Sequence, residues 1–269
     1  MERIQSSLHC VLQFLRNDPK GMSNFVHKYF VKEEADNFAF LASRIAMFVP
    51  EVNDLALEVV TFASESPETK TSPRLILAQR AFAKKSDLPP ACDHDPEFAK
   101  KVLTGWPVYA TQALVREAFA VWTDQDALCR VINVGLARIE SDPQTMTLTK
   151  TRKADPHFEG WVDFVMHVVF VATQWGELEK PVGGSMLVWS DLAKKLTAWA
   201  VRLLPFVDHN LVLFVQLLVC LDLLSEHECV HNLYTQELFD EQDSTINIYQ
   251  HPHIFWALFY ANRLKKKSC

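Results

Sequence analysis

Apolar residues recur three and four positions apart along most of the chain, and this spacing is the feature that most restricts its fold. An α-helix has 3.6 residues per turn, so residues at this spacing share one helix face and can pack against a neighbour. Three examples are Phe38, Leu41, Ile45 and Phe48, then Leu128, Val131, Ile132 and Ile139, and then Leu192, Leu196, Trp199 and Leu203. The spacing predicts a chain built almost wholly of helices.

Breaks in this pattern suggest how the helices are arranged. The 269 residues include only 7 glycines, whereas sheets use glycine at tight turns and bulges. Polar or proline-containing breaks occur at fairly even intervals, at 17–21, 50–53, 64–73, 86–95, 104–107, 141–156, 176–184 and 241–253. We therefore expect an all-α fold of about ten or eleven helices, an irregular stack of antiparallel helix pairs in the form of a HEAT-like α-solenoid.

The longest polar gap, 141–156, separates a more amphipathic first half from a more hydrophobic second half. Such a gap fits either a long loop or a boundary between domains. We predict a single helical-repeat domain covering 1–269, with a sub-boundary near 141–156 as the alternative.

Two segments, 161–175 and 211–224, are apolar nearly all round, so they should lie buried between other helices. Each is shorter than the roughly 20 residues that span a bilayer. The chain begins without an apolar segment of signal-peptide length, and its six cysteines form no C-x-x-C pair. We therefore expect reduced thiols, no membrane partner and a cytoplasmic location, with the nucleus as the alternative.

The formal net charge of −6 argues against a strongly basic surface for nucleic acid. Local basic groups remain: Lys150, Arg152 and Lys153 in the long gap, and the pairs Lys84-Lys85, Lys100-Lys101 and Lys194-Lys195, which could align into a stripe. Weak RNA contact through these Lys and Arg residues, as in a helical RNA-binding module, is therefore an alternative. The basic run at 263–267 is explained by the dipole at the end of a last helix, which His-Pro-His at 251–253 should open.

The sequence His227-Glu228-Cys229-Val230-His231 matches the H-E-x-x-H motif of zinc hydrolases. On a helix, His227 and His231 would lie one turn apart on the same face and could bind zinc, and Glu228 would act as the base. Catalytic zinc needs a third protein ligand, which in one large class is a histidine six residues after the second one, with a glycine midway. Glu237 and Tyr234 stand at those two places here.

Because the motif lacks this support, we interpret its histidines as part of a partly exposed helix face and assign no catalytic residue, metal or cofactor. A zinc-dependent hydrolase that uses His227, His231 and Glu228 is the second interpretation. A di-iron site would need a second E-x-x-H, which the chain lacks. The Asp93-His94-Asp95 and Asp208-His209 runs stand where helix caps are expected, so capping is the preferred role.

Several segments of the second half share an order and character with a known family. They are Leu128–Ile139, the charged gap after it, Gly160-Trp161-Val162, and Asp208-His209-Asn210 followed by the apolar run to Leu218. Over about 125–240 the chain resembles the middle domain of the eukaryotic translation-initiation scaffold protein, initiation factor four G, and related HEAT-like helical adaptors. The segment 50–121 departs from the simplest members because it adds helices.

The resemblance implies a non-enzymatic scaffold or adaptor for protein–protein interaction in RNA metabolism or translation regulation. Its partner would be an RNA-binding protein or a helicase, held on exposed helix edges and loops. The resemblance rests on apolar patterning, so it assigns no contact residue.

Overall fold

The computed structural model describes residues 1–16, 24–65, 72–82, 95–142, 156–178, 182, 191, 194, 211–224 and 252–268. These residues contain helices and turns and no strand, which confirms the prediction of an all-helical chain for this part of the sequence. The elements are α1 (Glu2–Arg16), α2 (Asn24–Phe48), the 3₁₀ turn η1 (Pro50–Val52), α3 (Asn53–Glu65), α4 (Pro73–Phe82), α5 (Phe98–Thr104), α6 (Val108–Ala120), α7 (Gln125–Ser141), α8 (Pro156–Ala172), α10 (Leu211–Leu224) and α13 (Pro252–Ser268). The solenoid arrangement itself stays a prediction.

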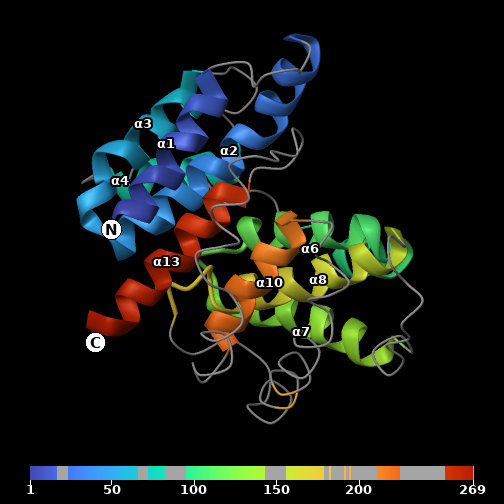
Figure 1. The fold of residues 1–269 in the computed structure, drawn as a ribbon. Helices are drawn as coiled ribbons and strands as arrows, with labels where there is room; N and C mark the ends of the chain where they lie inside the picture. The colour runs from blue at the N-terminus through green and yellow to red at the C-terminus, as the bar shows by residue number, and fades with distance from the viewer. Residues whose placement is uncertain are drawn as a thin grey trace. The chain divides into compact units, whose positions relative to one another are not determined.

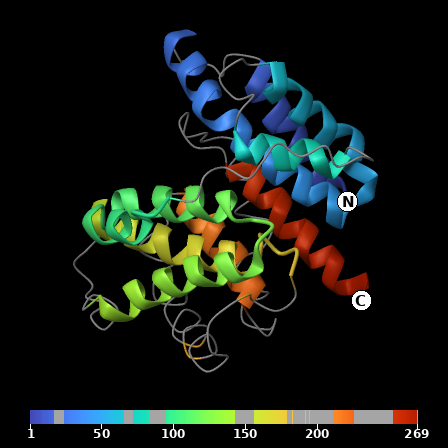
Figure 2. The ribbon, with the colours of Figure 1, turned by 180° about the vertical axis from the view of Figure 1, so that it is seen from behind.

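The helices group into two compact units, shown from opposite sides in Figures 1 and 2. Unit 1 consists of 1–89 together with 226–269, and unit 2 consists of 90–225. In sequence, unit 2 is thus inserted into unit 1. Both sides of the predicted sub-boundary at 141–156 belong to unit 2, and whether the chain is one domain stays a prediction.

Unit 1 is built around α2, which packs against α3, α4 and α13, while α13 also packs against α1. In both views the red α13 lies beside the blue α1 and α2 (Figures 1 and 2). The predicted face of α2 is confirmed, since Phe38, Leu41 and Ile45 are buried. The guanidinium of Arg3 donates a hydrogen bond to the Tyr260 hydroxyl at 3.0 Å, which joins α1 to α13.

Basic residues of the last helix, α13, pack against aromatic rings, a role that the sequence did not indicate. The helix begins at Pro252, as predicted. The Lys265 Nζ lies 5.0 Å from the centre of the Phe48 ring on α2, and the Arg263 guanidinium carbon lies 4.7 Å from the Phe259 ring. A cation over an aromatic face is stabilised by the ring quadrupole, so these two side chains contribute to packing as well as to the helix dipole.

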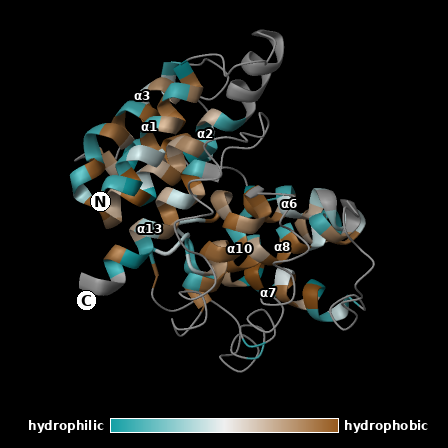
Figure 3. Cartoon of the chain, in the orientation of Figure 1, coloured by the Kyte–Doolittle hydropathy of each residue, from teal (hydrophilic) through white to brown (hydrophobic). Residues whose placement is uncertain are grey.

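Unit 2 is built around α8, which packs against α6, α7 and α10. Figure 3 shows α8 and α10 coloured as hydrophobic along most of their length, and both are buried in their central turns, as predicted. A Cβ added at Gly135 of α7 would lie 2.9 Å from Val168 Cγ2, so this glycine permits the close approach of α7 and α8.

The C-terminal turn of α8 corrects one expectation. In the sequence Trp175 stands beside a glycine and a predicted break, which favours the surface more for this tryptophan than for most others, but only 4% of it is exposed. Gln174, Trp175 and Gly176 have φ values of 48°, 53° and 88°, which fold the chain back after the helix. The Trp175 ring therefore stacks on Phe119 of α6, with ring centres 5.4 Å apart.

Candidate interaction surfaces

The residues of the predicted zinc motif, His227, Glu228 and His231, lie outside the described part of the chain. The same holds for the Asp208-His209 run. Among the described residues, no three His, Cys, Asp or Glu side chains are grouped so that they could hold a metal ion. The hydrolase therefore stays an alternative that rests on the sequence alone.

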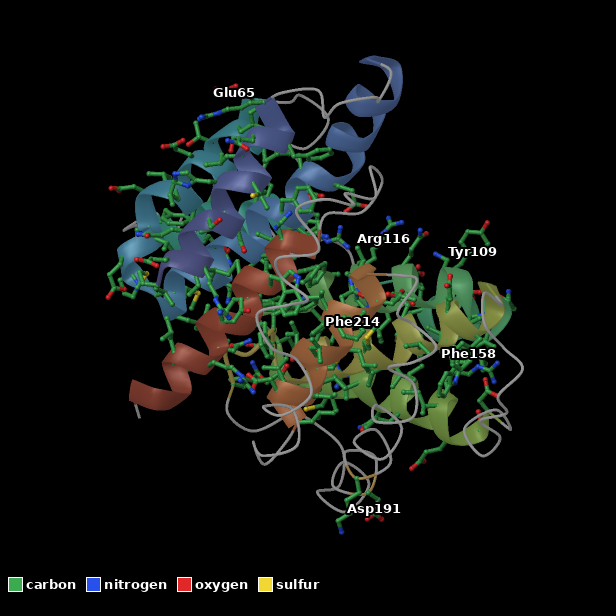
Figure 4. The ribbon with its side chains drawn as sticks, in the orientation of Figure 1. Glu65, Tyr109, Arg116, Phe158, Asp191 and Phe214 are labelled. Carbon is green, nitrogen blue, oxygen red and sulfur yellow. The ribbon has the colours of Figure 1, made fainter. Side chains whose placement is uncertain are left out.

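A surface groove of about 380 Å³ lies along α5 and α6 in unit 2. Each helix presents residues three, four or seven positions apart, which is the spacing of a single helix face. We call this the α5–α6 groove; its lining residues are Asp95, Phe98, Lys101, Thr104, Gly105, Tyr109, Gln112, Ala113, Arg116 and Glu117. In Figure 4, Tyr109 and Arg116 project from α6, and Tyr109 extends away from the ribbon.

One large aromatic side chain stands exposed in this groove. Tyr109 lines the groove and is 67% exposed. Gly105 allows the turn between α5 and α6 to be tight, because a Cβ there would lie 2.9 Å from Tyr109 Cβ and 3.0 Å from the Lys101 carbonyl oxygen. The position of Tyr109 thus depends on a glycine four residues earlier.

Ion pairs and backbone hydrogen bonds organise the polar side of the groove. Lys101 donates to the Asp95 carboxylate, and the Glu97 backbone N–H donates to the other Asp95 oxygen at 2.9 Å. These two hydrogen bonds, with that of Lys101 the larger cause, lower the pKa of Asp95. The Asp95 backbone N–H in turn donates to the buried Glu117 carboxylate at 3.2 Å. Asp95 therefore acts at the start of α5, close to its predicted capping role.

A second groove of about 410 Å³ lies along α3 beside the end of α1 in unit 1. We call this the α1–α3 groove; its lining residues are Arg16, Asp54, Leu57, Glu58, Thr61, Phe62 and Glu65. The Arg16 guanidinium donates to the Glu58 carboxylate at 2.9 Å, with both side chains about half exposed. Leu57 is 45% exposed. Three carboxylates, one of them paired with the guanidinium, therefore lie between the apolar side chains of Leu57 and Phe62 on this face of α3.

One cysteine of unit 2 lies near a His–Asp pair but is not arranged as a nucleophile. His167 Nδ1 lies 3.2 Å from Asp163 Oδ1 on the same face of α8. The Cys220 thiol on α10 donates to the Met166 carbonyl oxygen at 3.4 Å. Burial, with a smaller effect of the Asp163 charge, raises the pKa of Cys220 well above its ordinary value. The thiol stays protonated at neutral pH, whereas a nucleophilic cysteine needs the thiolate.

The predicted basic stripe can be followed at one complete lysine pair, because Lys84, Lys85 and Lys195 lie outside the described residues, as does the separate basic cluster at 150–153. Lys100 lies 3.0 Å from the Glu97 carboxylate, and Lys101 pairs with Asp95. Both cations therefore already face acids of their own segment, which weakens the field that phosphate would experience.

Sequence reasoning did not find either groove. A helical pattern indicates which face is buried, but Tyr109 and Leu57 lie on the other face, where single apolar residues are common and carry no signal.

Comparisons of the chain with protein-family models, with curated proteins and with solved structures found no match. No helix in the described part of the chain is both long and apolar enough to cross a bilayer.

Proposed function

We propose that the chain is a non-enzymatic scaffold that binds another protein, in the manner of HEAT-like helical adaptors. The observation that carries the proposal is the α5–α6 groove, where Tyr109 is exposed beside the ion pair of Lys101 and Asp95. Tyrosine is enriched among the residues that dominate protein–protein affinity, because it combines a large apolar surface with a hydroxyl and few rotatable bonds. The charged pairs around it would form the polar rim of an interface.

We place this scaffold in RNA metabolism or translation, in the cytoplasm, with an RNA-binding protein or a helicase as partner. This part of the proposal is supported by the resemblance of 125–240 to the middle domain of the translation-initiation scaffold. Two of the apolar segments that carry the resemblance form α8 and α10, which pack against each other in unit 2.

The test is affinity purification of the full chain from native lysate, identification of the retained protein, and measurement of Kd with that protein purified. We expect Tyr109→Ala to weaken binding at least tenfold, since a central aromatic residue contributes about 2 kcal/mol or more. Met47→Ala, at another exposed apolar residue far from this groove in sequence, is the control and should leave Kd within about twofold.

Two other results would replace the proposal. One equivalent of zinc in protein purified without added metal, lost in His227→Ala, together with no protein partner, would favour the hydrolase. Retention of RNA alone, with an affinity that falls steeply with salt, would favour a helical RNA-binding module. Equal Kd values for the wild type and Tyr109→Ala would remove the α5–α6 groove as the interface.

A further inference from the structure

The α1–α3 groove has a charge pattern that selects one kind of partner. On a helical projection, Asp54, Glu58 and Glu65 fall within an arc of about 40°, with Leu57 on one side of them and Phe62 on the other. The segment from Pro50 to Glu65 contains four acids and no basic residue. The acids and the apolar residues therefore share one exposed face of α3.

Among the residues that the structure describes, Arg16 is the one cation that lines this groove. Arg16, at the end of α1, pairs with Glu58 and so neutralises the acid in the middle of the strip. Asp54 and Glu65 flank that pair about one turn and two turns away along α3. Neither is in an ion pair within the described part of the chain. The groove thus has a negative charge near each end, at Asp54 and at Glu65. The exposed side chain of Leu57 lies near the end at Asp54.

We propose that the α1–α3 groove binds a basic amphipathic helix of a protein partner. Leucine side chains of that helix would cover Leu57 and Phe62, and its lysines or arginines would lie beside Asp54 and Glu65. The strip from Asp54 to Glu65 is roughly 17 Å long, which corresponds to three turns of a helix in a groove. The same carboxylates would repel phosphate, so the groove selects a protein segment over RNA or an anionic lipid surface.

This inference rests on the proposed scaffold function and adds the chemical class of a partner segment. The probe is a labelled synthetic helix of about 14 residues, with lysines along the middle of one face and leucines on both sides of those lysines. The comparison peptide carries glutamates in place of the lysines. We expect the full-length protein to bind the lysine probe, with an affinity that falls as salt screens the charges, and to bind the glutamate peptide at least tenfold more weakly.

Variants then locate the site. Asp54→Lys and Leu57→Ala should each weaken binding of the lysine probe at least about fivefold, whereas Glu51→Lys should change it by less than twofold. Glu51→Lys changes the charge of the same segment by the same amount, and Glu51 is exposed, but its side chain does not line the groove. Circular dichroism spectra that match the wild type would show that each variant is folded.

Equal binding of the two peptides, or equal losses in Asp54→Lys and Glu51→Lys, would overturn the inference. Its failure is distinguishable from failure of the scaffold function. If the lysine probe does not bind but a protein partner is still lost in Tyr109→Ala, the scaffold stands and the basic partner segment is rejected. If neither occurs, both proposals fail.

Discussion

A carbon atom added at Gly135 would point at Val168 on α8, with Leu114 of α6 only slightly farther away. Val168 is β-branched and buried, so its side chain has little freedom to move aside. Alanine is favoured over glycine in a helix by about 1 kcal/mol, but overpacking a core costs about 1–3 kcal/mol. The contact with Val168 therefore decides whether replacing Gly135 by alanine raises or lowers the free energy of unfolding.

We expect Gly135→Ala to lower the free energy of unfolding by about 1 kcal/mol, measured by urea denaturation. In a Val168→Ala background the added methyl group has space, so Gly135→Ala should there be neutral or stabilising. The same effect in both backgrounds would show that the contact with Val168 does not limit this position.

The buried thiol of Cys220 predicts a dependence of stability on alkaline pH. Because burial raises its pKa in the folded state, the unfolded chain loses this proton first, near pH 8.5. The stabilisation is complete below that pH and is lost as pH rises from there toward the folded pKa. The free energy of unfolding should therefore fall above pH 8.5 by up to about 1.4 kcal/mol per pH unit more in the wild type than in Cys220→Ala. Parallel pH profiles for the two proteins would contradict this.

The residue scale is also where sequence reasoning was least complete. The sequence favours the surface more for Trp175 than for most other tryptophans, because Trp175 stands beside glycine and a predicted break. Its burial follows from three consecutive positive φ values that turn the ring back onto α6. A conformation that is unusual for glutamine and tryptophan has no signature in the apolar spacing.

At the scale of single elements, the pair of Asp95 and Lys101 ties the start of α5 to its own last turns. Because the pKa of Asp95 is lowered, its contribution to stability is present above the unfolded pKa and is lost as pH falls through the folded one. Both side chains are partly solvated, so the clearest readout is the titration itself.

We expect Lys101→Met to raise the pKa of Asp95 toward the ordinary value of about 3.9, followed by the carboxyl carbon shift in NMR. Lys100→Met is the matched control, since Lys100 pairs with Glu97 and not with Asp95. A similar shift in both variants would indicate a general effect of net charge.

Most elements could be predicted from the sequence, since apolar spacing and proline report on local structure. The break at 104–107, the buried face of α7 and the start of α13 at Pro252 all agree with the structure. Their partners could not be predicted. An amphipathic pattern shows that α13 has a face to bury, but it does not show that α1 and α2, more than 200 residues earlier, provide the cover. The two grooves could not be predicted for a related reason: the residues on exposed helix faces follow no periodic apolar pattern.

For the whole molecule, the division into units predicts that damage to α13 affects distant parts of the sequence selectively. Ile254 is fully buried, and its replacement by alanine should cost about 2–5 kcal/mol. We expect Ile254→Ala to increase hydrogen exchange in α1–α4, measured by mass spectrometry, while α6–α8 keep most of their protection.

Leu128→Ala on α7 is the reciprocal change, because Leu128 is equally buried in unit 2. It should increase exchange in α6–α8 and leave α1–α3 largely protected. Uniform loss of protection in either variant would mean that the chain unfolds as one cooperative body rather than as two units.

The insertion of unit 2 between α4 and α13 also has a consequence for the nascent chain. From Phe82 to Pro252 the ribosome must add about 170 residues, which takes roughly ten to thirty seconds at typical rates of synthesis. Throughout that time α13 has not been made, so the apolar faces of α1 and α2 that pack against it stay uncovered. Unit 2 is contiguous in sequence, so its synthesis begins after that of unit 1 and ends before unit 1 is complete, and unit 2 can fold first.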